Sequence, residues 1–393
     1  MRPRHLAVIV FATLAAFCAL YGPQPLLHVL QLEFGVAPST ASLCITLTLL
    51  PMGFAPILYG FLLERVAVRT MLAVALAALA GTALAIAQVH SFAVLLAVRL
   101  CQGMLIPAVF TALMTSIAAS CEGQALRRVM SFYIAATIFG GFSARAINGF
   151  VSTHHGWRMA FVATGALLFA AAVSTIWLAA PARPVAGQRL RLRDGLAVAV
   201  HPAFLPLYGT IFCCFFVFAG MLSFLPFRLT ALWGATGGTA SEFRIGLMYS
   251  GYLMGIVVSL FSVRISRALG GEIRAMAVGL FCYLGAVGLF FIPSVWVLFC
   301  AMFLFCAGMF SVHSTAPGYL NNLAARHGMG KGVVNGLYLS FYYTGGAMGS
   351  YLPGFLFDRY GWNAFVGGMA CVVGVALAIV LLVVRPGAAR RTE

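Results

Sequence analysis

Two arginines lie inside long apolar stretches of this chain, and their chemistry is best suited to binding. Arg99 and Arg145 each lie about 10–12 Å from the same predicted membrane surface, at the helical rise of about 1.5 Å per residue. A guanidinium in hydrocarbon is costly, so it should face a cavity, a backbone carbonyl or an anion. None of the eight acidic residues lies within an apolar stretch. The pair predicts a positive site for an anionic or neutral small molecule, unless either arginine braces its helix against neighbouring carbonyls.

Polar and aromatic residues in other apolar stretches supply further candidate substrate contacts. Gln24 lies in the run Tyr21–Pro25, whose two prolines should break a helix and expose carbonyls to a cavity. Tyr342 and Tyr343 could line the same path. His313 lies near the middle of its stretch, where an imidazole could titrate near neutral pH. It is the candidate for proton coupling and a possible substrate contact, with a neutral histidine packed between helices as the alternative.

The composition indicates a membrane protein. The chain is 62% hydrophobic and only 8% charged, whereas soluble domains are about 25% charged. Its net charge of +16 comes from basic residues in short loops, which indicates membrane orientation and not nucleic-acid binding. No H-E-x-x-H motif, C-x-x-C pair or P-loop occurs, and the ten cysteines are spread along apolar stretches. We therefore predict no enzymatic activity, metal or cofactor, and a lipid bilayer as the surroundings.

The expected fold class is an all-α membrane protein with twelve transmembrane helices. The first apolar run continues to about Leu30 without an A-x-A cleavage site, so we expect a retained helix and not a signal peptide. Each stretch is long enough to cross a bilayer, at roughly 20 residues per span. The predicted spans are 6–31, 40–63, 70–89, 91–119, 129–152, 158–180, 204–231, 244–265, 273–292, 295–320, 332–357 and 362–384.

The distribution of basic residues predicts the topology. Eighteen of the 24 Lys and Arg residues lie on the side of the N-terminus and four on the opposite side. Basic loops stay in the cytoplasm, so both termini should be cytoplasmic in a bacterial inner membrane. The longest basic connection, 181–203, should be a cytoplasmic linker. It divides the chain into an N-terminal six-helix half, 1–180, and a C-terminal six-helix half, 204–393.

An internal repeat supports this division. Residues 101–162 match residues 306–367 without a gap, including Gly140-Gly141 with Gly345-Gly346 and Gly156-Trp157 with Gly361-Trp362. Repeated apolar segments predict two similar halves running in the same direction, with the substrate between them. Arg99 and Arg145 correspond to Leu304 and Ser350, so the shared fold does not require either charge.

Two motifs resemble those of major facilitator superfamily antiporters. Arg99-Leu-Cys-Gln102-Gly103 matches their R-x-x-Q-G signature, and the segment from Gly60 to Arg69 resembles their loop motif between spans two and three. The resemblance implies that this loop latches one conformation. Ala67 and Val68 depart from the motif, and Glu64 replaces its aspartate, which weakens the expected latch. The latch residues it implies are Gly60, Glu64, Arg65 and Arg69.

Over most of its length the chain is similar to the YnfM-type branch of this superfamily, as in Gln24-Pro25, Gly140–Arg145 and Tyr342-Tyr343. The resemblance implies alternating access by two parallel halves and export of a small organic solute, coupled to protons. We expect the protein to be a monomer. A facilitator or importer of an anionic metabolite remains an alternative because no carboxylate lies within a span. A membrane sensor of the same fold is the alternative outside transport.

Overall fold

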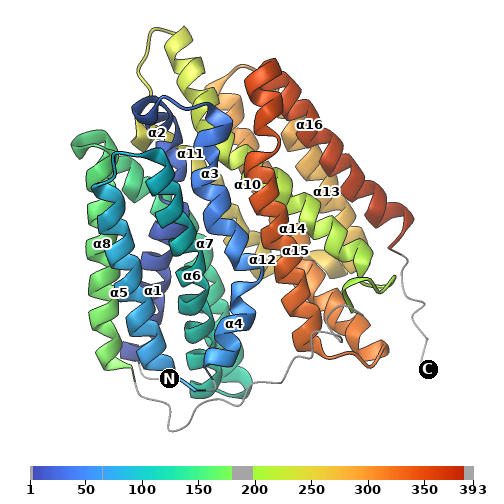
Figure 1. The fold of residues 1–393 in the computed structure, drawn as a ribbon. Helices are drawn as coiled ribbons and strands as arrows, with labels where there is room; N and C mark the ends of the chain where they lie inside the picture. The colour runs from blue at the N-terminus through green and yellow to red at the C-terminus, as the bar shows by residue number, and fades with distance from the viewer. Residues whose placement is uncertain (1–2, 64, 179–197, 385–393) are drawn as a thin grey trace.

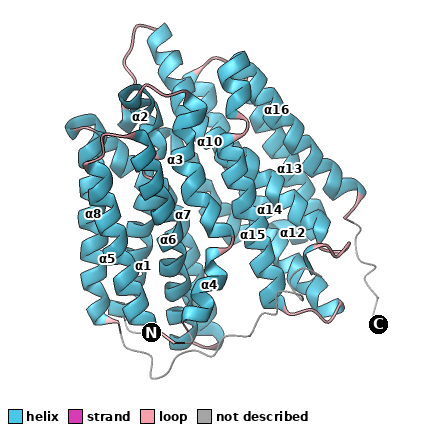
Figure 2. Ribbon diagram, viewed as in Figure 1, coloured by secondary structure: helices cyan, strands magenta, loops and turns pink. Residues whose placement is uncertain are grey.

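The computed structural model describes residues 3–63, 65–178 and 198–384, and these form a bundle of helices without strands (Figures 1 and 2). The predicted all-α membrane fold is confirmed. Four short segments are 3-10 turns, of which three interrupt longer helices and one follows the end of a helix. The elements are α1 (Pro3–Tyr21), η1 (Gln24–Leu26), α2 (Leu27–Phe34), α3 (Pro38–Leu49), η2 (Leu50–Gly53), α4 (Ala55–Leu62), α5 (Val68–Ala87), α6 (Phe92–Ser120), α7 (Gly123–His155), α8 (Trp157–Ser174), η3 (Thr175–Trp177), α10 (Leu205–Ala235), α11 (Glu242–Met248), η4 (Tyr249–Leu253), α12 (Met254–Ala268), α13 (Glu272–Leu289), α14 (Val295–Arg326), α15 (Lys331–Tyr351) and α16 (Gly354–Leu382).

The predicted spans all correspond to helices in this part of the chain. Ten helical segments are long and apolar enough to cross a bilayer, and α3–η2 with α4, bent by 49°, makes an eleventh. The predicted span 332–357 corresponds to α15, a helix rich in serine, glycine and tyrosine that is not among these eleven segments. Of the predicted linker 181–203, residues 181–197 lie outside the described residues, as does Glu64.

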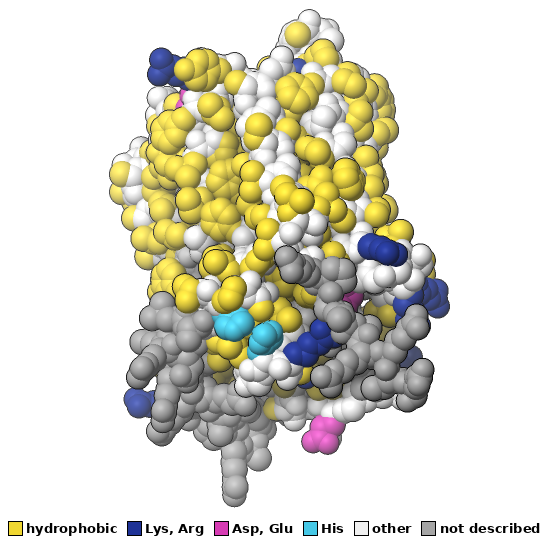
Figure 3. All heavy atoms as spheres, turned by 90° about the vertical axis from the view of Figure 1, so that its right-hand side faces the viewer, with side chains coloured by type: hydrophobic (Ala, Val, Ile, Leu, Met, Phe, Trp, Pro, Cys, Tyr) yellow, Lys and Arg dark blue, Asp and Glu magenta, His cyan; other side chains and the backbone are white. Residues whose placement is uncertain are grey.

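The outer surface of the bundle is apolar, as a bilayer requires (Figure 3). Large side chains such as Trp296 and Leu382 are each 78% exposed. On the face in Figure 3, Lys and Arg side chains lie mostly toward the lower end, where the N-terminus also lies in Figure 1. We call this end the basic end and the opposite end the far end. Because successive helices alternate in direction, α12 and α14 also finish at the basic end.

Glycines let the helices approach closely, as they do in membrane bundles. Along the contact of α10 with α15, a Cβ at Gly349 would lie 1.9 Å from the carbonyl oxygen of Phe216, and one at Gly345 would lie 2.3 Å from that of Phe212. Tyr283 reaches across from α13 to donate a hydrogen bond to the Cys214 carbonyl, 3.0 Å away. The helices from α10 onward therefore pack as a tight group.

The helices before and after residues 179–197 meet at mid-depth and at the far end. At mid-depth, Ser340 of α15 donates a hydrogen bond to the Gly53 carbonyl at 2.5 Å. Nearer the far end, the Thr46 and Ser350 hydroxyls lie 2.7 Å apart. Such contacts join α3 to α15, while α7 packs against α11. The far end is thus closed by two seams between the halves of the chain.

Gly149 is the closest point of the α7–α11 seam, and a side chain there should prevent closure. A Cβ at Gly149 would lie 2.4 Å from the Glu242 carbonyl oxygen and 3.2 Å from the Phe243 Cα. We expect Gly149→Val to shift the protein toward a state open at the far end, because this backbone contact cannot be rebuilt around a branched side chain. Distances between spin labels on α7 and α11 should increase. Gly285→Val is the control, since nothing lies within 4 Å of a Cβ at Gly285. An equal increase of the spin-label distances in both variants would contradict the prediction.

Candidate functional site

The guanidinium of Arg145 is enclosed where the two halves of the chain meet. Its Nε donates to the Gln24 side-chain oxygen at 2.6 Å, and one terminal nitrogen donates to the Gly141 carbonyl. The other, Nη2, is buried without a hydrogen-bond partner. Three rings surround the group, with their centroids 4.5, 4.9 and 5.0 Å from its central carbon: Tyr21, Tyr249 and Tyr252. We call this set, with Gln24, the tyrosine cage.

Two helix breaks place the residues of the cage around Arg145. Pro23 and Pro25 cannot donate backbone hydrogen bonds, so the first span gives way to η1 just after Tyr21. Gln24 emerges from this break and also donates to the Ser223 hydroxyl of α10 at 3.4 Å. The second break is η4, which contributes Tyr249 and Tyr252. Arg145 itself comes from the continuous helix α7, so the cage draws on both halves.

The electrostatics of the cage favour an anion. Arg145 is 0% exposed, and its described neighbours are neutral oxygens and aromatic faces. Aromatic faces stabilise a cation, although less than a carboxylate would in a dry site. A buried N–H without a partner costs roughly 1–3 kcal/mol. A carboxylate or another anionic group reaching Nη2 would relieve that cost and complete the charge pairing.

Arg99 occupies a different environment and does not join Arg145. It donates to the carbonyls of Ala19 at 2.7 Å, Leu20 at 3.2 Å and Cys44 at 2.8 Å, and to the Gln102 side chain at 2.5 Å. Because Pro23 has no N–H, the Ala19 carbonyl has no helical donor four residues on. Arg99 supplies that donor and so ties α6 to the end of α1 and to α3. Its geometry is that of a brace through carbonyls.

An aromatic wall continues from the cage along α15 and α14. The Tyr342 ring stacks on Phe215 at 3.7 Å and lies 5.0 Å from the Tyr343 ring. His313 packs 4.7 Å from Tyr342, and its Nδ1 lies 2.8 Å from the Tyr338 hydroxyl. Phe215 in turn lies 6.1 Å from Phe218, whose ring is 5.6 Å from that of Tyr252 in the cage. Five predicted contacts therefore gather in one region: Gln24, Arg145, His313, Tyr342 and Tyr343.

Tyr249 and Tyr252 were not predicted as site residues. Both belong to η4, a break that contains no proline and therefore has no strong sequence signal. The usable signal is the pair of tyrosines three residues apart in an apolar span, since a span facing only lipid needs no hydroxyl. A partial signal also existed for Tyr21, which precedes the proline break.

The predicted latch loop is only partly described. Gly60 lies in α4 and Arg69 lies in the first turn of α5, while the Arg65 side chain is exposed between them. Glu64 lies outside the described residues. The latch therefore stays a prediction. For metals, the described residues contain no group of three or more His, Cys, Asp or Glu side chains that could hold an ion.

Comparison with known proteins identifies the family. The family model for the Major Facilitator Superfamily matches residues 9–335, which is most of the chain. The chain belongs to the major facilitator superfamily. It is a multi-pass membrane protein of a transporter family and not an enzyme.

Individual superfamily members match along nearly the full chain. The inner membrane transport protein YnfM of Escherichia coli (strain K12) is 27% identical, covering 95% of this chain and 87% of that protein. The multidrug efflux protein YfmO of Bacillus subtilis (strain 168) is 24% identical, covering 96% and 93%. A bacterial homologue of the human lysosomal transporter Spinster, solved inward-facing and occupied, superposes with a TM-score of 0.79 at 14% identity, covering 98% and 97%. This last likeness concerns the fold alone.

Proposed function

We propose that this superfamily member is a secondary active transporter that exports a small anionic or neutral organic solute from a bacterial cell, coupled to protons. The observation that carries the proposal is the unpaired Nη2 of Arg145, buried within the tyrosine cage at the seam between the halves. The name of YfmO, a multidrug efflux protein, supports export, and that of YnfM, an inner membrane transport protein, supports the location.

The cage offers a way to couple binding to movement. Tyr21 and Gln24 belong to the same half as Arg145, whereas Tyr249 and Tyr252 belong to the other. When the far end opens, Tyr249 and Tyr252 withdraw, and the Arg145 guanidinium loses two of its aromatic neighbours. A bound anion can replace them, and its departure favours closure again. A ligand shifts an equilibrium only through different affinities for two states, and this exchange of partners supplies such a difference.

The proposed arrangement in the membrane follows the charge pattern. Both termini and the linker 181–203 lie in the cytoplasm, between halves comprising residues 1–180 and 204–393. The transporter acts as a monomer. The loop containing Gly60, Glu64, Arg65 and Arg69 latches one conformation. Arg99 holds helices together near the site, while Arg145, Gln24, Tyr342, Tyr343 and His313 face the solute during the cycle.

Flux measurements with matched probes test the function. Inverted vesicles containing the protein should accumulate anionic and neutral aromatic probes in preference to a cationic probe of the same size, because the site potential is positive. Vesicles without the protein give the background. Transport of the cation alone would overturn the proposed substrate class. Ligand binding without any flux in proteoliposomes would indicate a sensor and not a transporter.

A second candidate function, facilitated movement of an anionic metabolite without protons, is favoured by the positions of the carboxylates. In the described part of the chain, Glu122 immediately precedes α7, Glu242 and Glu272 begin their helices, and Glu33 and Asp358 lie within four residues of a helix end. None lies at mid-depth. Proton coupling, if present, then depends on another titratable group, of which His313 has the best position.

His313→Gln distinguishes the two candidates. If His313 carries the coupling proton, the variant should lose accumulation driven by a pH gradient but keep exchange of solute across the membrane, since glutamine preserves a hydrogen bond to Tyr338 without titrating. Accumulation and exchange are measured in the same proteoliposomes. His154→Gln, on the exposed end of α7, is the control. Undiminished accumulation in the His313 variant would show that coupling lies elsewhere or that no proton is carried.

A further inference from the structure

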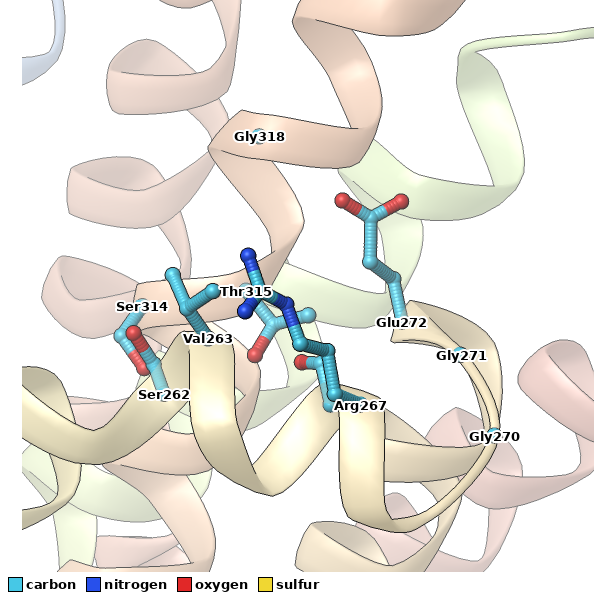
Figure 4. A pocket seen from close by; sticks show the side chains of 10 residues that line it. Ser262, Val263, Arg267, Gly270, Gly271, Glu272, Ser314, Thr315 and Gly318 are labelled. Carbon is cyan, nitrogen blue, oxygen red and sulfur yellow. The ribbon is translucent and has the colours of Figure 1, made fainter.

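A pocket separate from the tyrosine cage lies at the basic end of the bundle (Figure 4). It has a volume of about 460 Å³ and lies between the ends of α12 and α14 and the first turn of α13. One basic, one acidic and four hydroxyl side chains line it: Ser262, Ser266, Arg267, Glu272, Ser314 and Thr315. Neither substrate binding nor the predicted latch uses any of them.

Three side-chain donors in this pocket, those of Ser266, Arg267 and Thr315, have no partner among the described residues. Thr315 is only 7% exposed, yet its hydroxyl makes no hydrogen bond. Its neighbour Ser314 satisfies itself by donating to the Phe310 carbonyl at 2.7 Å, and Ser262 bonds the Ser259 carbonyl at 2.9 Å. The Arg267 guanidinium likewise has no ion pair or hydrogen bond, and Figure 4 shows it extending toward Thr315. The Thr315 hydroxyl and the exposed Arg267 guanidinium therefore both leave donors open to an anionic group that enters the pocket.

The charge around the pocket is positive. Gly270 and Gly271 turn the chain through positive φ angles of 76° and 135°, and α13 begins directly after them without a side-chain cap. The free N–H groups of its first turn favour an anion. Arg274 folds over this turn, with Nη1 2.7 Å from where a Cβ of Gly270 would lie. Burial raises the pKa of the one carboxyl group in the pocket, that of Glu272, and Arg326 opposes this shift. A phosphate group fits this combination of guanidinium, hydroxyls and helix N-terminus.

The surface above the pocket identifies the source of that phosphate. Val257, Leu260 and Val263 are 47%, 64% and 60% exposed and follow one face of α12 toward Arg267. An acyl chain in the bilayer can lie along this apolar face while its headgroup reaches the pocket. We propose that the pocket binds the phosphate of an anionic phospholipid in the leaflet at the basic end. Basic pockets between helices on the cytoplasmic side are known to hold such headgroups.

Lipid retention by the purified full-length protein tests this proposal. Native mass spectrometry after exchange into mixed phosphatidylglycerol and phosphatidylcholine should show one tightly held phosphatidylglycerol. Arg267→Gln should weaken its retention roughly tenfold, the effect of losing a hydrogen bond to a charged group. Thr315→Val should weaken it less, and Thr315→Ser should retain it. Arg264→Gln is the matched control, because Arg264 lies over the Phe261 ring at 5.5 Å, outside the pocket lining.

Two results would overturn the proposal. One is equal retention of both lipids, or an equal loss in the Arg264 and Arg267 variants, either of which would mean unspecific attraction to a basic surface. The other comes from a second arm with inorganic phosphate and glycerol phosphate in detergent. Stabilisation by these soluble ions that depends on Arg267 and that phosphatidylglycerol does not displace would assign the pocket to a soluble phosphate compound.

Discussion

Replacing Arg145 with alanine should reduce binding of an anionic solute by roughly tenfold to a hundredfold, because a hydrogen bond to a charged group contributes about 1.5–3 kcal/mol. The Arg145 guanidinium is the charged group that the tyrosine cage surrounds, and its Nη2 has no hydrogen-bond partner and can bind an anion. Arg145→Lys should lose less, since it keeps the charge but loses the planar fork and its contact with the rings. Affinities from thermal shift and initial flux rates with the same anion measure the effect.

The control for this prediction is Arg158→Ala. Arg158 forms an ion pair with Glu33 at 2.7 Å, but both side chains are 37% exposed. Removing this arginine should therefore change the affinity for the anion very little. A neutral probe of the same shape should bind the Arg145 variants almost as well as the wild type. If Arg145→Ala lowers thermal stability while leaving the preference between anionic and neutral probes unchanged, the arginine only joins helices.

Arg99→Leu should instead destabilise the protein by about 3 kcal/mol or more, with little change in ligand preference. The carbonyls of Ala19, Leu20 and Cys44 would each lose a donor, and a buried group left unpaired costs roughly 1–3 kcal/mol. Arg99→Lys should be intermediate, because a single ammonium cannot reach acceptors on both α1 and α3 at once. The midpoint of thermal unfolding in detergent measures the effect.

Leu100→Ala provides the comparison for Arg99. Leu100 is the next residue on α6 and is 41% exposed, so shortening it creates no buried cavity. An Arg99→Leu protein that unfolds at the wild-type temperature would refute the brace. So would a selective loss of anion binding without destabilisation, which would place Arg99 at the solute.

Apolar length predicted the helices well, because burial in a bilayer leaves few alternatives for the backbone. The boundaries agree even at Gly361, where a φ of 78° breaks α16 just before the predicted start of the last span. The roles of the two arginines could not be separated from sequence. Their depth was similar, but what distinguishes them is the neighbouring chain: Arg99 meets backbone carbonyls, including that of Ala19 released by Pro23, whereas Arg145 meets aromatic rings, two of them from η4.

Only part of the tyrosine cage could be predicted, because its two helix breaks have different causes. Tyr21 and Gln24 lie at a helix break caused by prolines, and prolines are visible in the sequence. Tyr249 and Tyr252 depend on a 3-10 turn that tertiary packing imposes: a Cβ at Gly251 would lie 2.6 Å from the backbone of Met302. Such a contact between distant segments leaves no local pattern to detect.

The repeat gives the two far-end seams different characters. Arg145 on one seam corresponds to Ser350 on the other, where the Ser350 hydroxyl meets that of Thr46 and the Ala347 carbonyl of its own helix. The duplication that relates the halves has therefore lost its symmetry where a solute would be recognised. Of the two seams, the one formed by α7 and α11 carries the buried arginine, and the one formed by α3 and α15 meets through hydroxyl groups. An anion should therefore move close to the α7–α11 seam, away from the axis that relates the two halves. Ser350→Arg, which places a second arginine on the other seam, should hold the anion too tightly for release.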